Sequence, residues 1–526
     1  MSNDVAHLTI GELLDRAVER FGDREAYVFE DRRLTYAQLS EETDRWARAL
    51  MAAGVRPGDK VSLWMPNRIE WVLVFLAVSR IGAALVPVNT GFRSDEAAYV
   101  VGQSDSVMLI VSAEVRGRSL AEEGLTVLRD EQVSAGTLVV VGGPAPAGAL
   151  AVDDLLARAP EVSPEELAAR IATVRHEDVV LTLYTSGTTG FPKGAMHSHK
   201  VIRNMSDAAD RMKLTPEDTV VLYLPLYHVF GAAAVLSYMY SGGSIVLVET
   251  YDVGRSLELM ERERATVVYG ISTMFYDQMQ HPDFDKRDLS SIRLCITPGT
   301  ADLVRLNSEK MGPSVNVYGM TESTSMTTLA TLDDPMDMRA ETVGRPLPGF
   351  EVKIVGADGE TVGPDVVGEL VVRGHPVMLG YYKKPEATAE VLDADGWFRT
   401  GDAASLTPDG YVRYAGRIKE ILRVGGENVD PIEVETVLMR HPAVAMASLI
   451  GIPDERLDEV GVAYVQLLRG AEATSEELRA FLKERLAAFK VPRHVVLTGE
   501  FPKTGSGKIQ KFVLKQQFLE QSGAEG

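Results

Sequence analysis

The residues best suited to chemistry in this sequence form an uninterrupted run of hydroxyl side chains and glycines. The run, Thr185-Ser-Gly-Thr-Thr-Gly190, has no side chain that could pack in a core, and Lys193 follows it closely. Backbone N–H groups and hydroxyls can surround an anion and the lysine adds positive charge, so the run is typical of a phosphate-binding loop. The mostly apolar residues before it, 178–184, indicate that the loop leaves the end of a strand. A flexible linker is the alternative interpretation, although linkers seldom place a lysine after Phe-Pro.

This loop is not the P-loop of the NTPases. The P-loop pattern has glycine directly before the lysine and serine or threonine directly after it. Here Pro192 precedes Lys193 and Gly194 follows it. We therefore expect a nucleotide-phosphate loop of another lineage.

Three further segments, together with the loop, resemble the adenylate-forming enzymes, which include acyl- and aryl-CoA ligases, peptide-synthetase adenylation domains and beetle luciferases. They are Tyr318-Gly-Met-Thr-Glu-Ser323, Trp397-Phe-Arg-Thr-Gly-Asp402 with Gly416-Arg-Ile-Lys-Glu420, and Pro502-Lys-Thr-Gly-Ser-Gly-Lys508. Four motifs in the expected order make a chance match negligible. The chain is identified as a member of the acyl- and aryl-CoA ligase branch.

The resemblance implies a ligase that uses ATP, Mg²⁺ and CoA. A carboxylate is a poor leaving group, so its attack on the α-phosphate of ATP first gives an acyl-adenylate and pyrophosphate. The CoA thiol then displaces AMP. Both steps develop negative charge on phosphate, which calls for cations, N–H donors and a metal ion.

The resemblance also assigns the phosphate and metal contacts. The expected ligands of the β- and γ-phosphates are Thr185, Ser186, Gly187, Thr188, Thr189, Gly190 and Lys193. Glu322 is the expected Mg²⁺ ligand and Thr185 the second contact, because Mg²⁺ is bound through only about one or two carboxylates besides phosphate and water. Thr321 would bond the α-phosphate. Alone, Glu322 would more often be a solvated acid.

The adenosine contacts follow from the same motifs. Tyr318 offers a ring face to adenine, and the residues expected beside it are Gly299, Thr300, Ala301, Asn316 and Val317. Gly319 would let the backbone approach the ligand. Asp402 suits the ribose, because a carboxylate can accept from both hydroxyls, and Arg417 would add a donor. A turn aspartate after Gly401 is the alternative for Asp402.

The C-terminal motif supplies the remaining catalytic expectations. Lys508 resembles the family's adenylation lysine, whereas a plain surface lysine is the alternative. Lys419 occupies the hinge position about which the C-terminal domain would rotate. Gly425 and Gly426 would then face the thiol and leave room for the pantetheine arm.

Two histidine features are less specific. His228, in Pro225-Leu-Tyr-His-Val-Phe-Gly231, matches the family's gate between the acyl pocket and ATP. A hydrogen-bonded core histidine is the alternative. His197-Ser-His199 could suggest a metal pair, but no cysteine or acid at ligand spacing completes such a site.

The sequence gives the least information about which carboxylic acid is the substrate. No acidic residue lies between Pro225 and Val248 to bind the ammonium of an amino acid, and we expect no carrier-protein module. Two segments depart from the pattern most common in the resembled family. Ser272 stands where that family usually has proline, and Pro298-Gly-Thr300 replaces a Gly-Gly-Ala type of run. Additional hydroxyls favour a substituted aromatic acid. A medium- or long-chain fatty acid, a ligase that loads a carrier protein, and a non-catalytic relative are the alternatives.

An α/β fold must position these residues. Capping boxes at Thr9/Glu12 and Thr35/Gln38 predict helices, and the segments 61–65, 70–80 and 84–88 predict a βαβ unit. Further buried strands are expected at 220–224, 245–248 and 266–269. The stretch 135–160, rich in Ala, Gly and Pro, suggests a surface excursion.

The C-terminal part has a different texture. Short strands with Asp-Gly turns over 343–414 predict a small β-rich unit. Beyond it, Asp430-Pro431 and the pair Thr474/Glu477 each begin a helix. We expect a large AMP- and acyl-binding domain over 1–416 and a mobile α+β lid over 417–526, with the hinge near Lys419.

Composition limits the possible partners. The length of 526 residues implies roughly two to four domains. The formal charge of −21 argues against nucleic acid, so local cations must meet the phosphates. The single Cys295 and the polar N-terminus fit the cytoplasm, and the most apolar run, 71–78, is too short to span a bilayer. The expected partners are a small carboxylic acid, ATP and CoA; a homodimer is compatible with the sequence.

Overall fold

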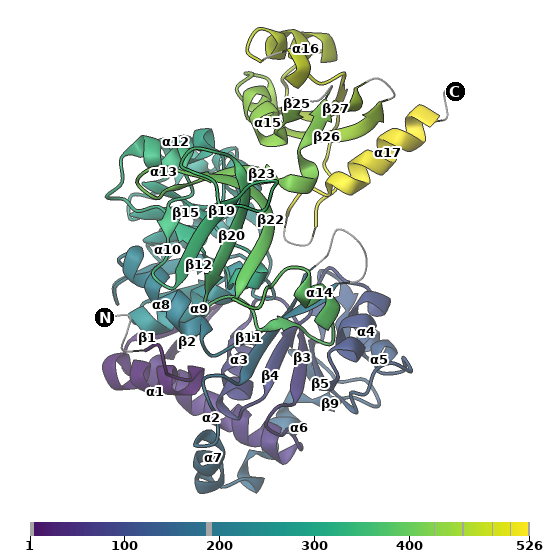
Figure 1. Cartoon of the computed structure of the whole chain (residues 1–526). Coiled ribbons are helices and arrows are strands. Elements are labelled where there is room, and N and C mark those ends of the chain that lie inside the picture. The colour runs from purple at the N-terminus through teal and green to yellow at the C-terminus, as the bar shows by residue number, and fades with distance from the viewer. Residues whose placement is uncertain are drawn as a thin grey trace.

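The computed structural model describes residues 5–185, 192–424, 427–454, 457–486, 488–504 and 507–523. A large N-terminal domain of α/β layers carries a smaller α+β domain at its C-terminal end (Figure 1). This confirms the predicted fold class. The positions of the domain boundary and of the hinge remain predictions.

A nine-stranded sheet carries the nucleotide motifs. Its central strands are parallel, and β2, β17 and β18 are antiparallel to their neighbours. In spatial order the strands are β18 (Arg345–Pro346), β17 (Thr328–Leu329), β16 (Ser314–Tyr318), β15 (Leu294–Thr297), β14 (Val267–Tyr269), β12 (Thr219–Leu222), β13 (Ser244–Leu247), β1 (Glu25–Phe29) and β2 (Arg32–Thr35).

An eight-stranded sheet carries the phosphate loop. Its order is β21 (Gly380–Tyr381), β11 (Lys193–Ser198), β10 (Val179–Thr185), β4 (Ala84–Pro87), β3 (Lys60–Trp64), β5 (Ser106–Ser112), β8 (Thr137–Val141) and β9 (Leu150–Ala151). β3 and β4 are parallel neighbours joined through α3, which confirms the βαβ unit. The expected surface excursion over 135–160 is wrong in part, because β8 inserts there as a buried strand beside β5. Its Leu-Val-Val-Val run was a strand signal that the surrounding glycine and proline obscured.

The helices of the large domain cover these sheets. They are α1 (Ile10–Phe21), α2 (Tyr36–Ala52), α3 (Ile69–Arg80), α4 (Ser94–Gln103), α5 (Leu120–Val127), α6 (Val152–Ala157), α7 (Pro164–Ile171), α8 (Val201–Arg211), α9 (Val229–Ser241), α10 (Val253–Arg262), α11 (Ser272–Met279), α12 (Ala301–Lys310), α13 (Met336–Glu341) and α14 (Pro385–Ala389). Both predicted capping boxes are present, at the starts of α1 and α2. Helices α3 and α9 are buried on nearly all sides, as expected for apolar helices in the interior.

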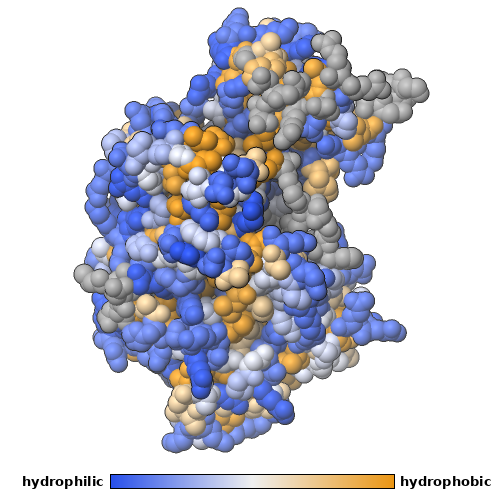
Figure 2. Space-filling view, in the orientation of Figure 1, coloured by the Kyte–Doolittle hydropathy of each residue, from blue (hydrophilic) through white to orange (hydrophobic). Residues whose placement is uncertain are grey.

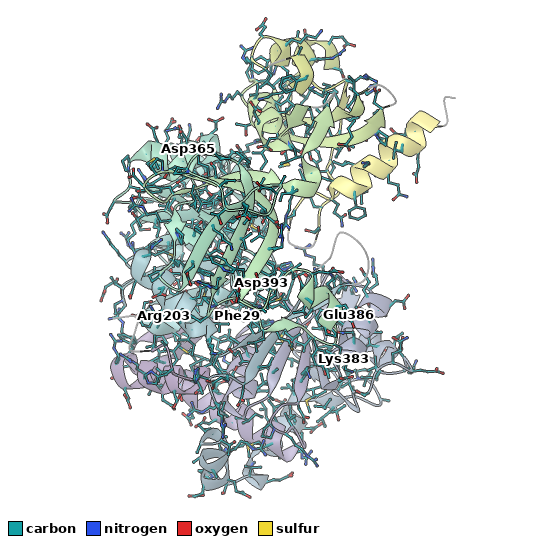
Figure 3. All side chains as sticks on the ribbon, in the orientation of Figure 1. Phe29, Arg203, Asp365, Lys383, Glu386 and Asp393 are labelled. Atoms are coloured by element: carbon teal, nitrogen blue, oxygen red, sulfur yellow. The ribbon has the colours of Figure 1, made fainter. Side chains whose placement is uncertain are left out.

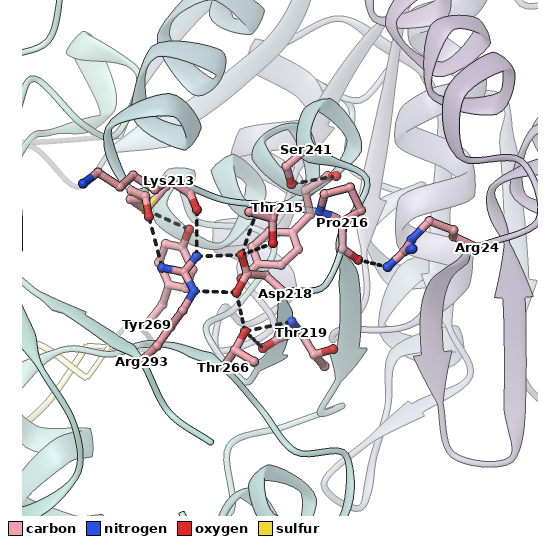
Figure 4. Close-up of polar contacts among 12 residues, drawn as sticks. Arg24, Lys213, Thr215, Pro216, Asp218, Thr219, Ser241, Thr266, Tyr269 and Arg293 are labelled. Atoms are coloured by element: carbon pink, nitrogen blue, oxygen red, sulfur yellow. Dashed lines mark hydrogen bonds and ion pairs between the residues drawn. The ribbon is translucent and has the colours of Figure 1, made fainter. Parts of the chain in front are cut away.

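One polar cluster ties together the ends of the nine-stranded sheet opposite the motifs (Figure 4). Asp218, just before β12, pairs with Arg293 at 2.6 Å and accepts a hydrogen bond from the Thr266 hydroxyl at 2.7 Å. Because Thr266 precedes β14 and Arg293 precedes β15, the buried carboxylate fixes the relative positions of three neighbouring strands. The strands can then present their opposite ends to a ligand in a fixed register.

The β-rich unit and the C-terminal domain complete the chain. The predicted β-rich unit is a four-stranded antiparallel sheet of β19 (Phe350–Val355), β20 (Gly368–Gly374), β22 (Trp397–Leu406) and β23 (Val412–Arg417). The C-terminal sheet contains β24 (Leu422–Val424), β25 (Glu427–Val429), β26 (Val444–Asp454), β27 (Asp458–Leu467) and β28 (His494–Leu497), with helices α15 (Pro431–Met439), α16 (Ser475–Lys483) and α17 (Lys511–Gly523). As predicted, Asp430 caps α15 and the pair Thr474/Glu477 caps α16.

The C-terminal domain has cores of its own. Apolar residues of α15 and α16 pack with one part of its sheet, while Leu514 of α17 packs with Tyr464 and Phe501 in a second cluster. An ion pair also links the domains: Arg440, at the end of α15, contacts Asp302 of α12 at 2.8 Å. Figure 2 shows a largely hydrophilic visible face with hydrophobic patches on the large domain below the C-terminal domain. Within the described residues, no helix is long and apolar enough to cross a membrane.

Candidate active site

The two ends of the phosphate loop lie side by side. Thr185 ends β10, Lys193 begins β11, and the two residues are paired across this antiparallel hairpin. The hairpin holds the expected second metal contact and the loop cation on neighbouring strands. The expected phosphate ligands Ser186, Gly187, Thr188, Thr189 and Gly190 lie outside the described residues.

A tyrosine connects this hairpin to the expected metal ligand. Tyr381 lies on β21, beside β11, and its hydroxyl donates a hydrogen bond to Glu322 Oε1 at 2.8 Å. Lys193 Nζ lies 5.1 Å from the centre of the same ring. Glu322 is 7% exposed and belongs to the 3₁₀ helix Thr321–Ser323. The structure therefore brings Lys193 and Glu322 together through a residue that the sequence analysis did not identify.

The segment around Glu322 is tightly folded. Thr324 and Ser325 both have positive φ, 57° and 78°, which is uncommon for residues other than glycine. A Cβ added at Gly319 would lie 1.4 Å from the Ser325 carbonyl oxygen. The protein's own backbone thus requires Gly319, and the close approach of a ligand at this position remains a prediction.

The two histidines of the suspected metal pair support this turn and the N-terminal helix. His197 Nδ1 lies 3.1 Å from the Thr324 hydroxyl, and His199 Nδ1 accepts a hydrogen bond from the Ile10 amide at 2.9 Å. Burial lowers the pKa of each imidazole to about 4, so both are neutral at pH 7. Among the described residues, no group of three or more His, Cys, Asp or Glu side chains could hold a metal ion.

The ribose and adenine residues form a second cluster. Asp402 is buried on β22 and accepts a hydrogen bond from the Tyr318 hydroxyl at 2.6 Å. Arg417 Nε lies 2.8 Å from the other carboxylate oxygen. Burial raises the pKa of Asp402, although Arg417 and Tyr318 oppose the shift. The ring of Tyr414, a residue not identified from the sequence, lies 5.6 Å from the ring of Tyr318.

The loop after β15 is fixed by Asn316. This side chain donates to the Gly299 carbonyl oxygen at 2.8 Å and accepts from the Gly299 amide at 3.2 Å, while it also accepts from the Val317 amide at 2.9 Å. Thr300 caps α12, which Ala301 begins, and accepts a hydrogen bond from the Leu303 amide. All five residues expected beside adenine therefore lie at the ends of β15 and β16.

The hydroxyls on which the aromatic-acid expectation rested already have partners in the protein. The Thr300 hydroxyl caps a helix, and the Ser272 hydroxyl lies 3.4 Å from the Pro298 carbonyl oxygen, to which it donates. Gly507 of the C-terminal domain approaches the same region: a Cβ added there would lie 2.9 Å from the Ile271 side chain. Each hydroxyl thus has one partner within the protein, and the aromatic-acid expectation remains a prediction.

Lys508 extends from the C-terminal domain towards the large domain. Its charge interacts with those of Arg417 and Asp402 in the ribose cluster and of Glu322 in the metal cluster. Its loop is closed by hydrogen bonds from the Thr504 amide to the Lys508 carbonyl oxygen, at 2.7 Å, and from the Lys508 amide to the Thr504 hydroxyl, at 3.1 Å. The surrounding protein and the Arg417 charge lower the pKa of Lys508, although its side chain keeps contact with solvent.

His228 also lies near Lys508. Burial, with the positive charge of Lys508 as the second cause, lowers the pKa of His228 to about 4. The imidazole is therefore neutral at pH 7, at the start of α9. The next two residues, Val229 and Phe230, are only half-buried, and the Phe230 ring contacts Tyr269 edge-on at 5.6 Å.

The hinge and thiol-side residues are described only in part. The backbone of Lys419 lies in the 3₁₀ helix Ile418–Glu420, which directly follows β23. Gly425 and Gly426 lie outside the described residues. Lys383 and Glu386, which follow Tyr381 in the chain, are labelled in Figure 3. They lie at α14, close to the eight-stranded sheet.

Comparison with known proteins covers nearly the whole chain. The family model described as AMP-binding enzyme matches residues 14–382, and that of the AMP-binding enzyme C-terminal domain matches residues 433–508. A methyl-dioxo-octahydroindenyl propanoyl:CoA ligase of Rhodococcus jostii is 38% identical over 97% of this chain and 98% of its own. The mitochondrial medium-chain acyl-CoA ligase of Mus musculus is 36% identical over 98% of this chain and 88% of its own. The crystal structure of an anthranilate CoA ligase in complex with anthranoyl-AMP superposes with a TM-score of 0.90 at 28% identity and covers 100% of both chains.

Proposed function

The chain belongs to the AMP-binding enzyme family and is an acyl-CoA ligase, and from this premise we propose that its acid is a medium-sized hydrophobic carboxylic acid. The observation that carries the proposed chemistry is that the charge of Lys508, a residue of the C-terminal domain, interacts electrostatically with those of Asp402 and Glu322 in the large domain. A lysine supplied by the C-terminal domain, within electrostatic range of two buried acids, suits a reaction in which negative charge develops on phosphate.

ATP would lie across the two clusters. The loop from Thr185 to Lys193 would hold the β- and γ-phosphates, and Thr321 the α-phosphate. Asp402 would accept the ribose hydroxyls, since a carboxylate has acceptor capacity beyond its bonds to Tyr318 and Arg417. Tyr318 would offer its ring to adenine.

Mg²⁺ fits the donors around Glu322. Its carboxylate is buried, and the Tyr381 hydroxyl bonds one oxygen, so the second oxygen can serve as a ligand. Thr185, at the start of the loop, would supply a hydroxyl. Binding through one carboxylate together with substrate phosphates is the ordinary mode for this ion, which when bound would neutralise phosphate charge.

The chain's own residues then serve two successive steps. In the first, an acid oxygen forms a bond to the α-phosphorus as the bond from that phosphorus to the pyrophosphate oxygen breaks, and the Lys508 ammonium stabilises the developing charge. In the second, the CoA sulfur attacks the acyl carbon, the thiol proton goes to solvent and AMP leaves. The neutral His228 can lie beside the acid without adding a charge.

The residues beside His228 favour a hydrophobic acid as the substrate. Val229 and Phe230 are half-buried beside His228, and no acidic residue occurs between Pro225 and Val248 to bind an ammonium group. The names of the two full-length relatives, a medium-chain ligase and a bicyclic propanoate ligase, support a medium-sized acyl group. A substituted aromatic acid is the second candidate, favoured by the likeness to the anthranilate CoA ligase.

A product assay tests this proposal. The protein is incubated with ATP, Mg²⁺ and a panel of straight-chain, bicyclic and substituted benzoic acids, with and without CoA. We expect AMP and pyrophosphate as products, and the highest kcat/KM for a medium-chain or bicyclic acid. ADP as the nucleotide product would overturn the mechanism. A preference for substituted benzoic acids would favour the second candidate, and release of pyrophosphate without a CoA thioester would point to a carrier-protein acceptor.

A further inference from the structure

The strongest unassigned feature of the site is Tyr381. Its backbone is fixed on the edge strand β21: residue 381 pairs with Ala195 of β11, and its amide donates to the Thr388 hydroxyl at 2.9 Å. The Leu379 amide donates to the Met196 carbonyl oxygen and the Tyr382 amide to the Gly194 carbonyl oxygen, each at 2.8 Å. The side chain therefore leaves from a rigid part of the sheet, two residues along β11 from Lys193.

The side chain makes two directed contacts. The hydroxyl donates to Glu322 Oε1 at 2.8 Å, and the ring lies below Lys193 Nζ at 5.1 Å from its centre. Tyr381 is only 8% exposed. A phenol is protonated at neutral pH, so the hydroxyl is the donor and the carboxylate the acceptor in this bond.

We propose that Tyr381 is a positioning residue for adenylation, because its hydroxyl orients the Glu322 carboxylate and its ring holds the Lys193 ammonium at the phosphate loop. This inference rests on the proposed role of Glu322 as the Mg²⁺ ligand. A glutamate can rotate about three side-chain bonds, and a bond to one oxygen leaves the other aimed in a fixed direction. Partners that orient a metal ligand in this way typically change metal affinity about 10–100-fold when removed. A cation over an aromatic face is likewise held in place.

The neighbouring Tyr382 provides a matched control. Its hydroxyl donates to Asp105 Oδ2 at 2.7 Å, and Lys60 Nζ lies 4.1 Å from its ring centre. Tyr382 thus makes the same two kinds of contact, with a carboxylate and a lysine, but with residues that begin or precede β3 and β5 and have no expected role at the site. Loss of packing or of a hydrogen bond to a carboxylate affects both tyrosines, whereas loss of metal and phosphate positioning affects Tyr381 alone.

The decisive measurement is metal binding in the presence of ATP. Free Mn²⁺, used in place of Mg²⁺, is titrated by electron paramagnetic resonance against the full chain with saturating ATP. We expect Tyr381→Phe to weaken Mn²⁺ binding about tenfold or more. Tyr381→Leu should in addition weaken ATP binding without metal, because Lys193 loses its ring. Tyr382→Phe and Tyr382→Leu should leave both affinities unchanged.

Two further readouts separate positioning from structure. Tyr381→Phe should slow pyrophosphate release and leave thioester formation from a synthetic acyl-adenylate unchanged. In a Glu322→Gln background, Tyr381→Phe should cause almost no further loss of Mn²⁺ affinity, because the carboxylate that Tyr381 orients is absent. Tyr381→His, which keeps an N–H donor on a ring, should recover part of the affinity and serves as the test should the Phe variant not fold.

The outcomes distinguish this inference from its premise. Unchanged Mn²⁺ affinity in a folded Tyr381→Phe protein, or equal losses in both half-reactions, would overturn the role of Tyr381. If Glu322→Gln binds Mn²⁺ and ATP as tightly as the wild type, the assignment of Glu322 fails, and the proposed metal site fails with it.

Discussion

Several residues that the motifs assign to the ligand also have partners within the protein's own structure. Gly319 is required by the Ser325 carbonyl, and Asn316 holds Gly299 by two hydrogen bonds. Thr300 is a third example, because its hydroxyl is the cap of α12. A residue type that matches a motif therefore does not reveal which of its atoms remain free for substrate.

We predict that Thr300→Val lowers stability without changing acid preference. Valine cannot accept the Leu303 amide, and loss of a helix cap costs about 1 kcal/mol. Chemical denaturation measures the loss, and the ratio of kcat/KM for a hydroxylated benzoic acid to that for benzoic acid measures the preference. Thr474→Val removes the corresponding cap of α16, far from the site, and should behave alike. A shift of the ratio in the Thr300 variant alone would show that this hydroxyl contacts the acid.

At the scale of elements, the motifs predict the site because strands deliver them. Tyr318 ends β16, Thr185 ends β10, and Asp402 and Arg417 face each other on β22 and β23. Sequence alone placed these residues together through the order of motifs. It could not find Tyr381, since an edge strand of two residues has no periodicity, and the value of Tyr381 comes from Glu322, which is distant in sequence. Strand β8 was missed because local composition concealed a buried apolar run.

The cap of α15 supplies a prediction about pH. Asp430 Oδ1 accepts the Ile432 amide at 2.8 Å, and a Cβ added at Gly416 would lie 3.1 Å from that oxygen. Burial raises the pKa of Asp430 to about 6; the nearby Glu435 and Glu433 add to the shift, while the capping bond and Lys511 oppose it. Because the native carboxyl binds its proton more tightly than the unfolded one, native stability from this group falls as pH rises from about 4 to about 6 and then levels off.

Asp430→Asn should remove that dependence. Asparagine keeps the cap and carries no charge, so the variant should gain stability relative to the wild type as pH rises from about 4 to about 6. Thermal unfolding across this range measures the difference. Asp252→Asn, at the exposed cap of α10, controls for the amide substitution itself. A difference between wild type and Asp430→Asn that does not vary with pH would show that the Asp430 carboxyl titrates normally.

At the scale of the whole molecule, we propose that the C-terminal domain completes the site with Lys508. Tyr381 of the eight-stranded sheet bonds Glu322, and Tyr318 of the nine-stranded sheet bonds Asp402. The charge of Lys508, from the C-terminal domain, interacts with those of both carboxylates. We propose a boundary between residues 416 and 417, with rotation about Lys419 giving a second pose for the thiol step. The family matches, which end at 382 and resume at 433, leave this junction between them.

Lys419→Pro tests the two poses. Proline fixes φ near −65°, so the variant should keep pyrophosphate exchange and lose thioester synthesis.

Lys508→Ala should show the opposite division: adenylation slowed about 10²–10³-fold and thioester formation from a synthetic acyl-adenylate largely retained. Both half-reactions are followed separately in each variant. Full thioester turnover by Lys419→Pro would place the hinge elsewhere.

The ion pair between Arg440 and Asp302 joins the C-terminal domain to the large domain only weakly. Both side chains are exposed, 57% and 38%, and an exposed pair contributes only about 0–1 kcal/mol. This ion pair therefore adds little to the stability of the domain arrangement seen here, so in the proposed two-pose cycle bound ligands would have only a small contribution from it to overcome. Occupancy of the nucleotide site, and not strain stored in the protein, would then determine the order of the two chemical steps.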